Sequence, residues 1–157
     1  MLYFSAGLVH VPDCGFNEPR HIGCALGNRP DGPFEMMEKP VLSPDANDQW
    51  NNLGAGSMKV LMTSDGFIGF QNGIYLNNGI SGSAIRLMSS NNGQEWLPMT
   101  GQPILAPSGN GWMASHIYAC DIQFFEDRWY LYFNARTTAH WTKGVEKIGL
   151  ATGSSPT

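Results

Sequence analysis

An acidic residue inside an apolar segment is the first candidate for chemistry in this sequence. Asp121 lies in residues 117–136, IYACDIQFFEDRWYLYFNAR, where β-branched and aromatic residues flank a charged turn at 126–128. This pattern predicts a β-hairpin. A carboxylate among such neighbours costs on the order of several kcal/mol unless it finds a partner or faces a polar cavity. We therefore expect Asp121 to face a polar cavity, with Arg136 or a loop histidine nearby.

The histidines and cysteines of the sequence could ligate a metal, but they are not spaced along the chain as in known metal-binding motifs. His116 and His140 each lack a second ligand close by in the sequence, so hydrogen bonding at a rim is the better interpretation. Cys14, Cys24 and Cys120 are odd in number and show no C-x-x-C pattern. We expect reduced, buried cysteines, with zinc or a disulfide as the alternative. We expect no metal and no cofactor.

The composition indicates one globular domain spanning residues 1–157. Hydrophobic residues make up 42% of the chain and charged residues 14%, with a net charge of −4. The chain therefore lacks the basic surface that nucleic acids require. No apolar run approaches the roughly 20 residues that span a bilayer, and the first residues do not form an export signal. We expect no membrane partner and a cytoplasmic location.

A repeat of 63 residues organises the elements that carry these side chains. Residues 22–44 align without a gap on residues 85–107, and the same step carries Ile85 to Ile148. The step also carries residues 66–73 onto 129–136. A fixed period of this size indicates a repeat architecture. The strands expected in the two earlier copies are 2–6, 21–27, 33–42, 57–63, 66–72, 84–90 and 95–105.

Each repeat contains four strands, as in one blade of a β-propeller. The blades are expected at residues 1–42, 43–105 and 106–157, with the inner strand missing from the first and the outer strand from the last. Nineteen glycines and ten prolines, spread along the chain, fit this all-β architecture of short strands. About two and a half blades cannot close a ring, so we expect the open edges to pair with a second copy in a homodimer or higher homo-oligomer.

The meander predicts which connections share one face of the propeller. Connections from outer to inner strand and from second to third strand emerge on the same side. These are the long loops, and they carry most of the histidines and tryptophans, as a binding surface does. Their expected ranges are 7–20, 43–56, 73–83, 106–115 and 137–145. Tight turns at 64–65 and 126–128 lie at the opposite end.

Several phrases resemble a known family. IYACDIQFFEDRWYLYFNAR followed by EKIGLATG resembles the inner, second and third strands of five-bladed β-propeller glycoside hydrolases, the group of arabinanases, xylosidases and invertases. IRLMSSNNGQEW with PILAP is similar to their passage from third to fourth strand. The resemblance covers nearly the whole chain as a blade pattern. It implies a carbohydrate ligand.

The resemblance also implies which residues form a site. Glycosidases use paired carboxylates, and in this family these lie on the inner strands of different blades. Asp121 is the only acidic residue at such a position, because its counterpart 63 residues earlier is Met58. Glu146 resembles the acidic residue that precedes IGLA in the family. Asp121 and Glu146 are thus the candidate catalytic residues, with pocket lining or a hydrogen bond to a neighbouring blade as the alternatives.

Other side chains on the loop-bearing face are candidates for sugar binding. Arg136 offers a fork of donors for hydroxyls or a carboxylate, with a salt bridge to Asp121 or Glu146 as the alternative. Aromatic rings can stack on sugars or pack between blades. The candidate binding residues are Trp112, His116, Tyr118, Arg136, His140 and Trp141.

Three functions follow from this combination of features. The first is a glycosidase whose site is completed by a second chain. The second is a non-catalytic carbohydrate-binding module. The third is a self-assembling half-propeller without retained activity.

Overall fold

Ten β-strands and one short 3-10 helix make up residues 1–156. The computed structural model describes residues 1–156. The helix, η1, is Gly111–Met113. The strands are β1 (Leu2–Val11), β2 (Phe16–Leu26), β3 (Glu35–Met36), β4 (Met58–Thr63), β5 (Gly66–Asn77), β6 (Ile80–Ser90), β7 (Leu97–Pro98), β8 (His116–Phe125), β9 (Arg128–Arg136) and β10 (Glu146–Gly153).

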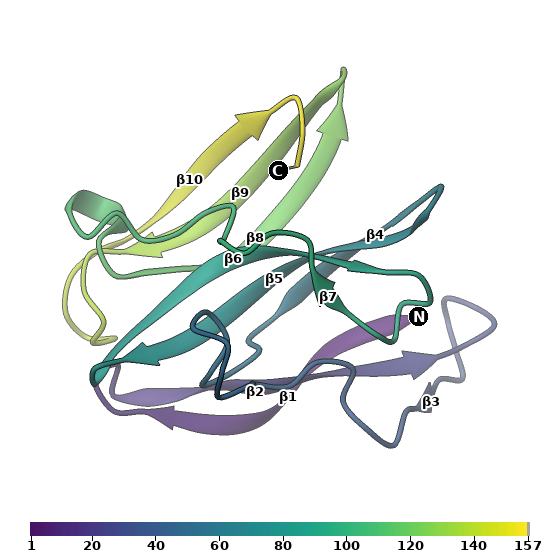
Figure 1. Ribbon diagram of the computed structural model, residues 1–157, viewed down its shortest axis with the longest axis horizontal. Coiled ribbons are helices and arrows are strands. Elements are labelled where there is room, and N and C mark those ends of the chain that lie inside the picture. The colour runs from purple at the N-terminus through teal and green to yellow at the C-terminus, as the bar shows by residue number, and fades with distance from the viewer. Residues whose placement is uncertain (157) are drawn as a thin grey trace.

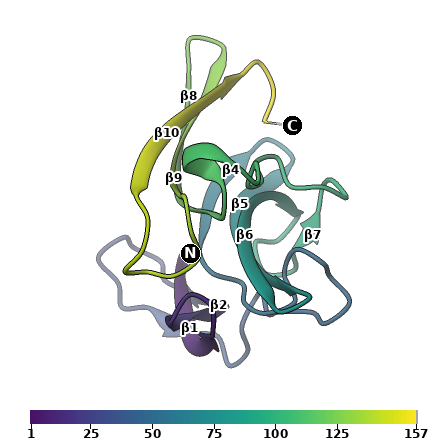
Figure 2. The same cartoon turned by 90° about the vertical axis from the view of Figure 1, so that its left-hand side faces the viewer.

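The strands form three antiparallel groups that follow one another along the chain (Figure 1). We name them blade 1 (β1–β3), blade 2 (β4–β7) and blade 3 (β8–β10). Blade 1 is a separate sheet, whereas blades 2 and 3 are joined by a single parallel pair, Ser83 with His116. Seen from the side, the three groups turn around a common centre without closing (Figure 2). The chain is therefore an all-β partial β-propeller, as the repeat predicted.

Blades 1 and 2 repeat the same hydrogen bonds at equivalent positions. Ile22 forms an antiparallel bridge with Leu42, and Ile85 forms one with Leu105. The amide of Ile22 lies 2.9 Å from the carbonyl oxygen of Leu42, and the corresponding distance in blade 2 is also 2.9 Å. The bridges hold a Pro-flanked aliphatic pair against β2 in blade 1 and against β6 in blade 2.

The β4–β5 hairpin of blade 2 and the β8–β9 hairpin of blade 3 are offset by one residue from the alignment expected from the sequence repeat. Thr63 pairs with Gly66 at the inner hairpin of blade 2, and Phe125 pairs with Arg128 in blade 3. Both hairpins have two-residue turns, so the structural step between them is 62 residues and the expected step of 63 is wrong there. Lys59, and not Met58, is consequently the counterpart of Asp121.

Two of the expected long loops are strands. Residues 7–20 belong largely to β1 and β2, and residues 73–83 belong largely to β5 and β6. In residues 73–83, glycine and serine allow close approach between elements. A methyl group at Gly73 would overlap the carbonyl of Trp50. Buried small residues thus extend the β5–β6 hairpin toward the loop-bearing end of the molecule.

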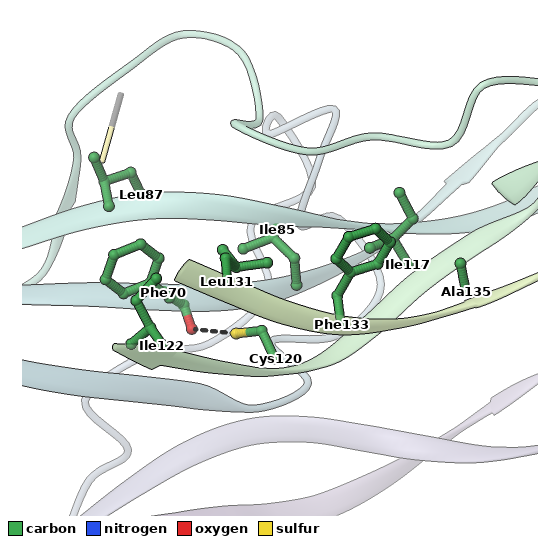
Figure 3. Packing of buried hydrophobic residues seen from close by; sticks show 9 residues of the cluster. All are labelled: Phe70, Ile85, Leu87, Ile117, Cys120, Ile122, Leu131, Phe133 and Ala135. Carbon is green, nitrogen blue, oxygen red and sulfur yellow. Dashed lines mark hydrogen bonds between the residues drawn. The ribbon is translucent and has the colours of Figure 1, made fainter. Parts of the chain in front are cut away.

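The main hydrophobic core lies between blades 2 and 3 (Figure 3). Blade 2 contributes Phe70, Ile85 and Leu87, which are at most 1% exposed. Blade 3 covers them with the aliphatic and aromatic side chains of β8 and β9. Side-chain donors reinforce the contact, since Asn72 Nδ2 and Ser83 Oγ each lie 2.9 Å from the carbonyl oxygen of Ile117. The three cysteines are buried free thiols, as the sequence predicted.

Substituting Gly149 tests this packing. A methyl group there would overlap the rings of Phe133 and Trp112. Because overpacking of a dense core displaces its neighbours, we expect Gly149→Ala to lower the free energy of unfolding by about 1–3 kcal/mol, measured by urea denaturation. Gly101→Ala is the matched control, since no atom lies within 4 Å of its added methyl group. Equal stability of both variants would contradict the packing described.

Candidate functional site

Two hairpin tips, from blades 1 and 2, meet the first residue of β8 in a buried polar cluster, which we call the hub. Ser81 Oγ, from blade 2, lies 3.4 Å from Cys14 Sγ of blade 1 and 3.2 Å from His116 Nε2 of blade 3. Cys14 Sγ also lies 3.4 Å from His116 Nε2. The backbone amide of Ser81 donates to Asp13 Oδ2 at 2.9 Å. Residues from distant parts of the sequence are therefore fixed relative to one another.

Burial keeps the hub uncharged at its centre. It lowers the pKa of His116 to about 4; the nearby Asp13 carboxylate opposes this shift and Arg136 adds to it. The imidazole is thus neutral near pH 7. Ser115 Oγ lies 2.7 Å from Nδ1, so a proton on Nδ1 leaves Nε2 free to accept from Ser81 or Cys14. Burial also raises the pKa of the Cys14 thiol.

A pocket of about 500 Å³ opens beside the hub. One wall comes from the β1–β2 hairpin, a second from strands β8, β9 and β10, and the third from the loop 137–145. Its walls carry three aromatic rings, one guanidinium and two carboxylates. The lining residues are Cys14, Phe16, Glu18, His116, Tyr118, Arg136, Ala139, Trp141 and Glu146.

The cationic and anionic groups of the third blade are held in place by hydrogen bonds. Arg136 Nη2 donates to the carbonyl oxygens of His140 at 3.1 Å and Trp141 at 2.7 Å. Asn134 Nδ2 donates to Glu146 Oε1 at 2.7 Å. Arg136 and Glu146 are paired residues of neighbouring strands, so both project on the same side of the sheet. The pocket therefore has a preformed polar wall.

The two pocket carboxylates have opposite pKa shifts. Burial raises the pKa of Glu18 from 4.5 to about 7, against the opposing charge of Arg136. A hydrogen bond from Tyr118 is the main cause that lowers the pKa of Glu146, and Asn134 and Arg136 act in the same direction. Near neutral pH the pocket thus holds one carboxyl that retains a proton for part of the time and one that is ionised. Such a pair can supply an acid and a base.

The structure brings together five of the eight residues singled out from the sequence. His116, Tyr118, Arg136, Trp141 and Glu146 all line the pocket. A sixth residue, His140, lies beside the pocket. Its backbone carbonyl accepts a hydrogen bond from the Arg136 guanidinium, and its ring nitrogen Nδ1 lies 3.0 Å from Thr142 Oγ1.

Trp112 lies in the core and not in the pocket. Its ring stacks on Phe133 with centroids 5.7 Å apart and an interplanar angle of 14°. Packing between elements, the alternative given for this tryptophan, is therefore what the structure shows.

The expectation of a polar cavity around Asp121 is wrong. Its side chain is 68% exposed and pairs with Lys59 at 3.6 Å. Asp121 lies five positions along β8 from His116, which corresponds to about 15 Å of strand. A β-bulge between Tyr118 and Asp121, with Ala119 at φ 48°, further changes the alternation on which the expectation rested. Arg136 and the loop histidines therefore lie far from this carboxylate.

Sequence reasoning missed the residues that blade 1 contributes. Phe16 and Glu18 fall in the segment assigned to the loop 7–20, but they belong to β2. Their alternating positions just before the apolar segment HIGCAL were the available signal. Only the docking of the β1–β2 hairpin against blade 3 shows that they face the pocket; the amide of Trp141 marks that contact by donating to the Cys14 carbonyl at 3.0 Å.

Metal-binding clusters and membrane-spanning helices are both absent from residues 1–156. This range contains no group of three or more histidine, cysteine or acidic residues placed to hold a metal ion. It also contains no helix long and apolar enough to cross a bilayer.

Solved structures share this fold. A glycoside hydrolase and a complex of BT0996 with RGII each match 85% of the chain, with a TM-score of 0.69 and 18% identity. A candidate glycoside hydrolase from Parabacteroides distasonis matches 98% of it, with a TM-score of 0.65 and 12% identity. The chain spans 40%, 40% and 44% of these proteins. No protein-family pattern and no curated protein matches the sequence.

The raised pKa of Glu18 makes a prediction about pH. The folded state retains a proton that the unfolded state loses above about pH 4.5, so the contribution of this group to stability falls as pH rises from 4.5 through 7. Replacing Glu18 by Gln removes this loss. We expect the stability of Glu18→Gln relative to the native chain to increase by about 1–3 kcal/mol between pH 5 and pH 8, measured by urea denaturation.

Glu35→Gln, at an exposed glutamate of β3, is the matched control. The change with pH expected for Glu18→Gln should exceed that of this control over the same range. A Glu18→Gln difference that is independent of pH would show that Glu18 ionises normally.

Proposed function

We propose that the pocket binds a carbohydrate and hydrolyses a glycosidic bond. The observation that carries the proposal is the pairing of Glu18 and Glu146, from different blades, in one pocket that also holds Arg136. The glycoside hydrolase fold of the similar structures supports it. Because the chain spans 40% of that structure, the activity is proposed for this pocket and is not transferred from the whole protein.

The chemistry of the walls suits a sugar. A sugar ring has apolar C–H faces and a rim of hydroxyls, so it requires flat apolar surfaces beside fixed hydrogen-bonding groups. Phe16, Tyr118 and Trp141 supply the aromatic surfaces. Arg136 and Glu146 supply donors and acceptors whose positions are fixed by the loop 137–145 and by Asn134. The volume of about 500 Å³ lies in the range of small-molecule sites.

The two carboxyl groups take different roles in hydrolysis. Glu18, in its protonated form, donates its proton to the glycosidic oxygen as the bond from that oxygen to the anomeric carbon breaks. Glu146, as a carboxylate, stabilises the positive charge that develops on the sugar. It then either attacks the anomeric carbon or removes a proton from the water that attacks it. If Glu146 attacks, water then releases the sugar from it and returns a proton to Glu18. If Glu146 instead deprotonates the attacking water, exchange of one proton with solvent restores both groups.

One observation favours non-catalytic binding as the second candidate function. Glu146 accepts hydrogen bonds from Tyr118 and Asn134, which hold it as a structural part of the wall. In that case the pocket would bind a sugar without turning it over.

A hydrolysis screen with aryl glycosides tests the proposal, because any active sugar releases a coloured phenol. With the best substrate found, we expect Glu146→Gln to lower kcat/KM by at least about 10²-fold, since it removes a group required for bond cleavage. Glu18→Gln should have a smaller effect, because an activated phenol departs without needing a proton. Asp121→Asn is the matched control and should keep the native rate, because this carboxylate lies outside the pocket.

Binding and turnover are separated by a second measurement. We expect Trp141→Ala to weaken sugar binding about tenfold in calorimetry, whereas Glu146→Gln should still bind. Sugar binding by the native chain without release of phenol would support the second candidate. Absence of both would contradict the proposed function.

A further inference from the structure

Blade 3 presents an apolar sheet face that no other part of residues 1–156 covers. Tyr132 pairs with Leu150, and Asn134 pairs with Ile148, so these four side chains project on the same side of the sheet. Ile148 is 75% exposed, Leu150 is 50% exposed and Tyr132 is 46% exposed. We call this side the open face of blade 3.

The same positions are buried in both preceding blades. Ile85 and Leu87, 63 residues before Ile148 and Leu150, are 0% exposed beneath blade 3. In blade 1 the equivalent residues, Ile22 and Cys24, are at most 1% exposed. They share a face with Tyr3, which reaches blade 2 through a hydrogen bond of 2.8 Å to the Gly93 carbonyl. In each blade this face is thus built to be covered by the next one.

Blade 1 carries the matching surface on its own uncovered side. The side of blade 3 that covers blade 2 contains Leu131 and Phe133, and the ring of Phe133 lies over Gly149. Blade 1 repeats this arrangement with Leu2 and Phe4, whose ring lies over Gly23. Leu2, the counterpart of the buried Leu131, is 48% exposed.

These equivalences define both halves of one interface on a single chain. We propose that the open face of blade 3 binds the Leu2 and Phe4 side of blade 1 in a second copy of this chain. The contact would repeat the internal packing of blade 3 on blade 2, shown in Figure 3. Two copies related by a two-fold axis would form this contact twice and so cover every open blade face.

The second copy also completes the proposed site. Tyr118 pairs with Asn134, and Glu146 pairs with Arg136, so the pocket lies on the same side of the sheet as Ile148. Blade 1 of the partner would therefore stand beside the pocket and supply a further wall. This part of the inference rests on the proposed function, whereas the assembly itself does not.

The mass in solution is the first test. We expect light scattering at micromolar concentration to give twice the chain mass of 17.2 kDa. Ile148→Asp should return the mass to that of one chain, because a carboxylate would be buried without a partner. Its circular dichroism spectrum should be unchanged, since this residue is 75% exposed within one copy. Leu97→Asp, at a 70% exposed leucine of β7 in blade 2, is the matched control and should stay dimeric.

Cross-linking distinguishes the proposed arrangement from other dimers. The three native cysteines are buried, so a short bis-maleimide should leave the native chain uncoupled. We expect a mixture of Leu2→Cys and Ile148→Cys chains to couple, while each variant alone should not. Coupling of Ile148→Cys with itself would indicate that two open faces meet, and would overturn the proposal. A native mass of one chain would overturn it as well.

Ligand binding separates this inference from the proposed function. With a sugar that binds the native chain, we expect Ile148→Asp to weaken binding at least about tenfold, although the residue does not line the pocket. A dimer that binds no sugar would leave the assembly intact and remove the function. Unchanged sugar binding by a monomeric Ile148→Asp chain would show that the partner does not contribute a wall.

Discussion

The hydrogen bonds among Cys14, Ser81 and His116 are the interaction on which the rest of the molecule depends. Cys14 and Ser81 lie near the tips of the β1–β2 and β5–β6 hairpins, His116 is the first residue of β8, and each residue is at most 4% exposed. Because a buried polar group without a partner is costly, the three segments must meet in one arrangement. That arrangement places Phe16 and Glu18 of blade 1 opposite Tyr118 and the neighbouring strands of blade 3. The pocket is therefore a product of the hub and not of any single blade.

Much of the fold could be predicted because its signals are local and repeated. Alternating apolar residues and the Pro-flanked pairs near Leu42 and Leu105 identified the strands and the blade period. The error at residues 73–83 occurred where glycine and serine have a tertiary role. At Gly73 and in the residues leading to Ser83, small side chains permit close packing, a requirement that no local pattern reveals. The one-residue offset between the β4–β5 and β8–β9 hairpins could not be predicted either, because a sequence alignment does not specify strand register.

The candidate site was predictable only on the side built from consecutive sequence. Arg136, Trp141 and Glu146 lie on one loop and its flanking strands, so their proximity followed from the expected hairpin. Glu18 could not be found in this way, because its place in the pocket depends on contacts between residues more than a hundred positions apart. Asp121 was misleading for the opposite reason: a local irregularity, the bulge at Ala119, changed the direction of its side chain.

Blades 2 and 3 are joined by one backbone pair, and their relative angle is therefore set by the side chains between them. Phe70 and Phe133 act as spacers in this contact, so a change in their volume would alter the curvature of the array and not the pairing within a blade. Curvature determines how many blades complete a circle. Substitutions in a few core positions could thus convert one ring size into another during evolution, while every strand kept its hydrogen bonds.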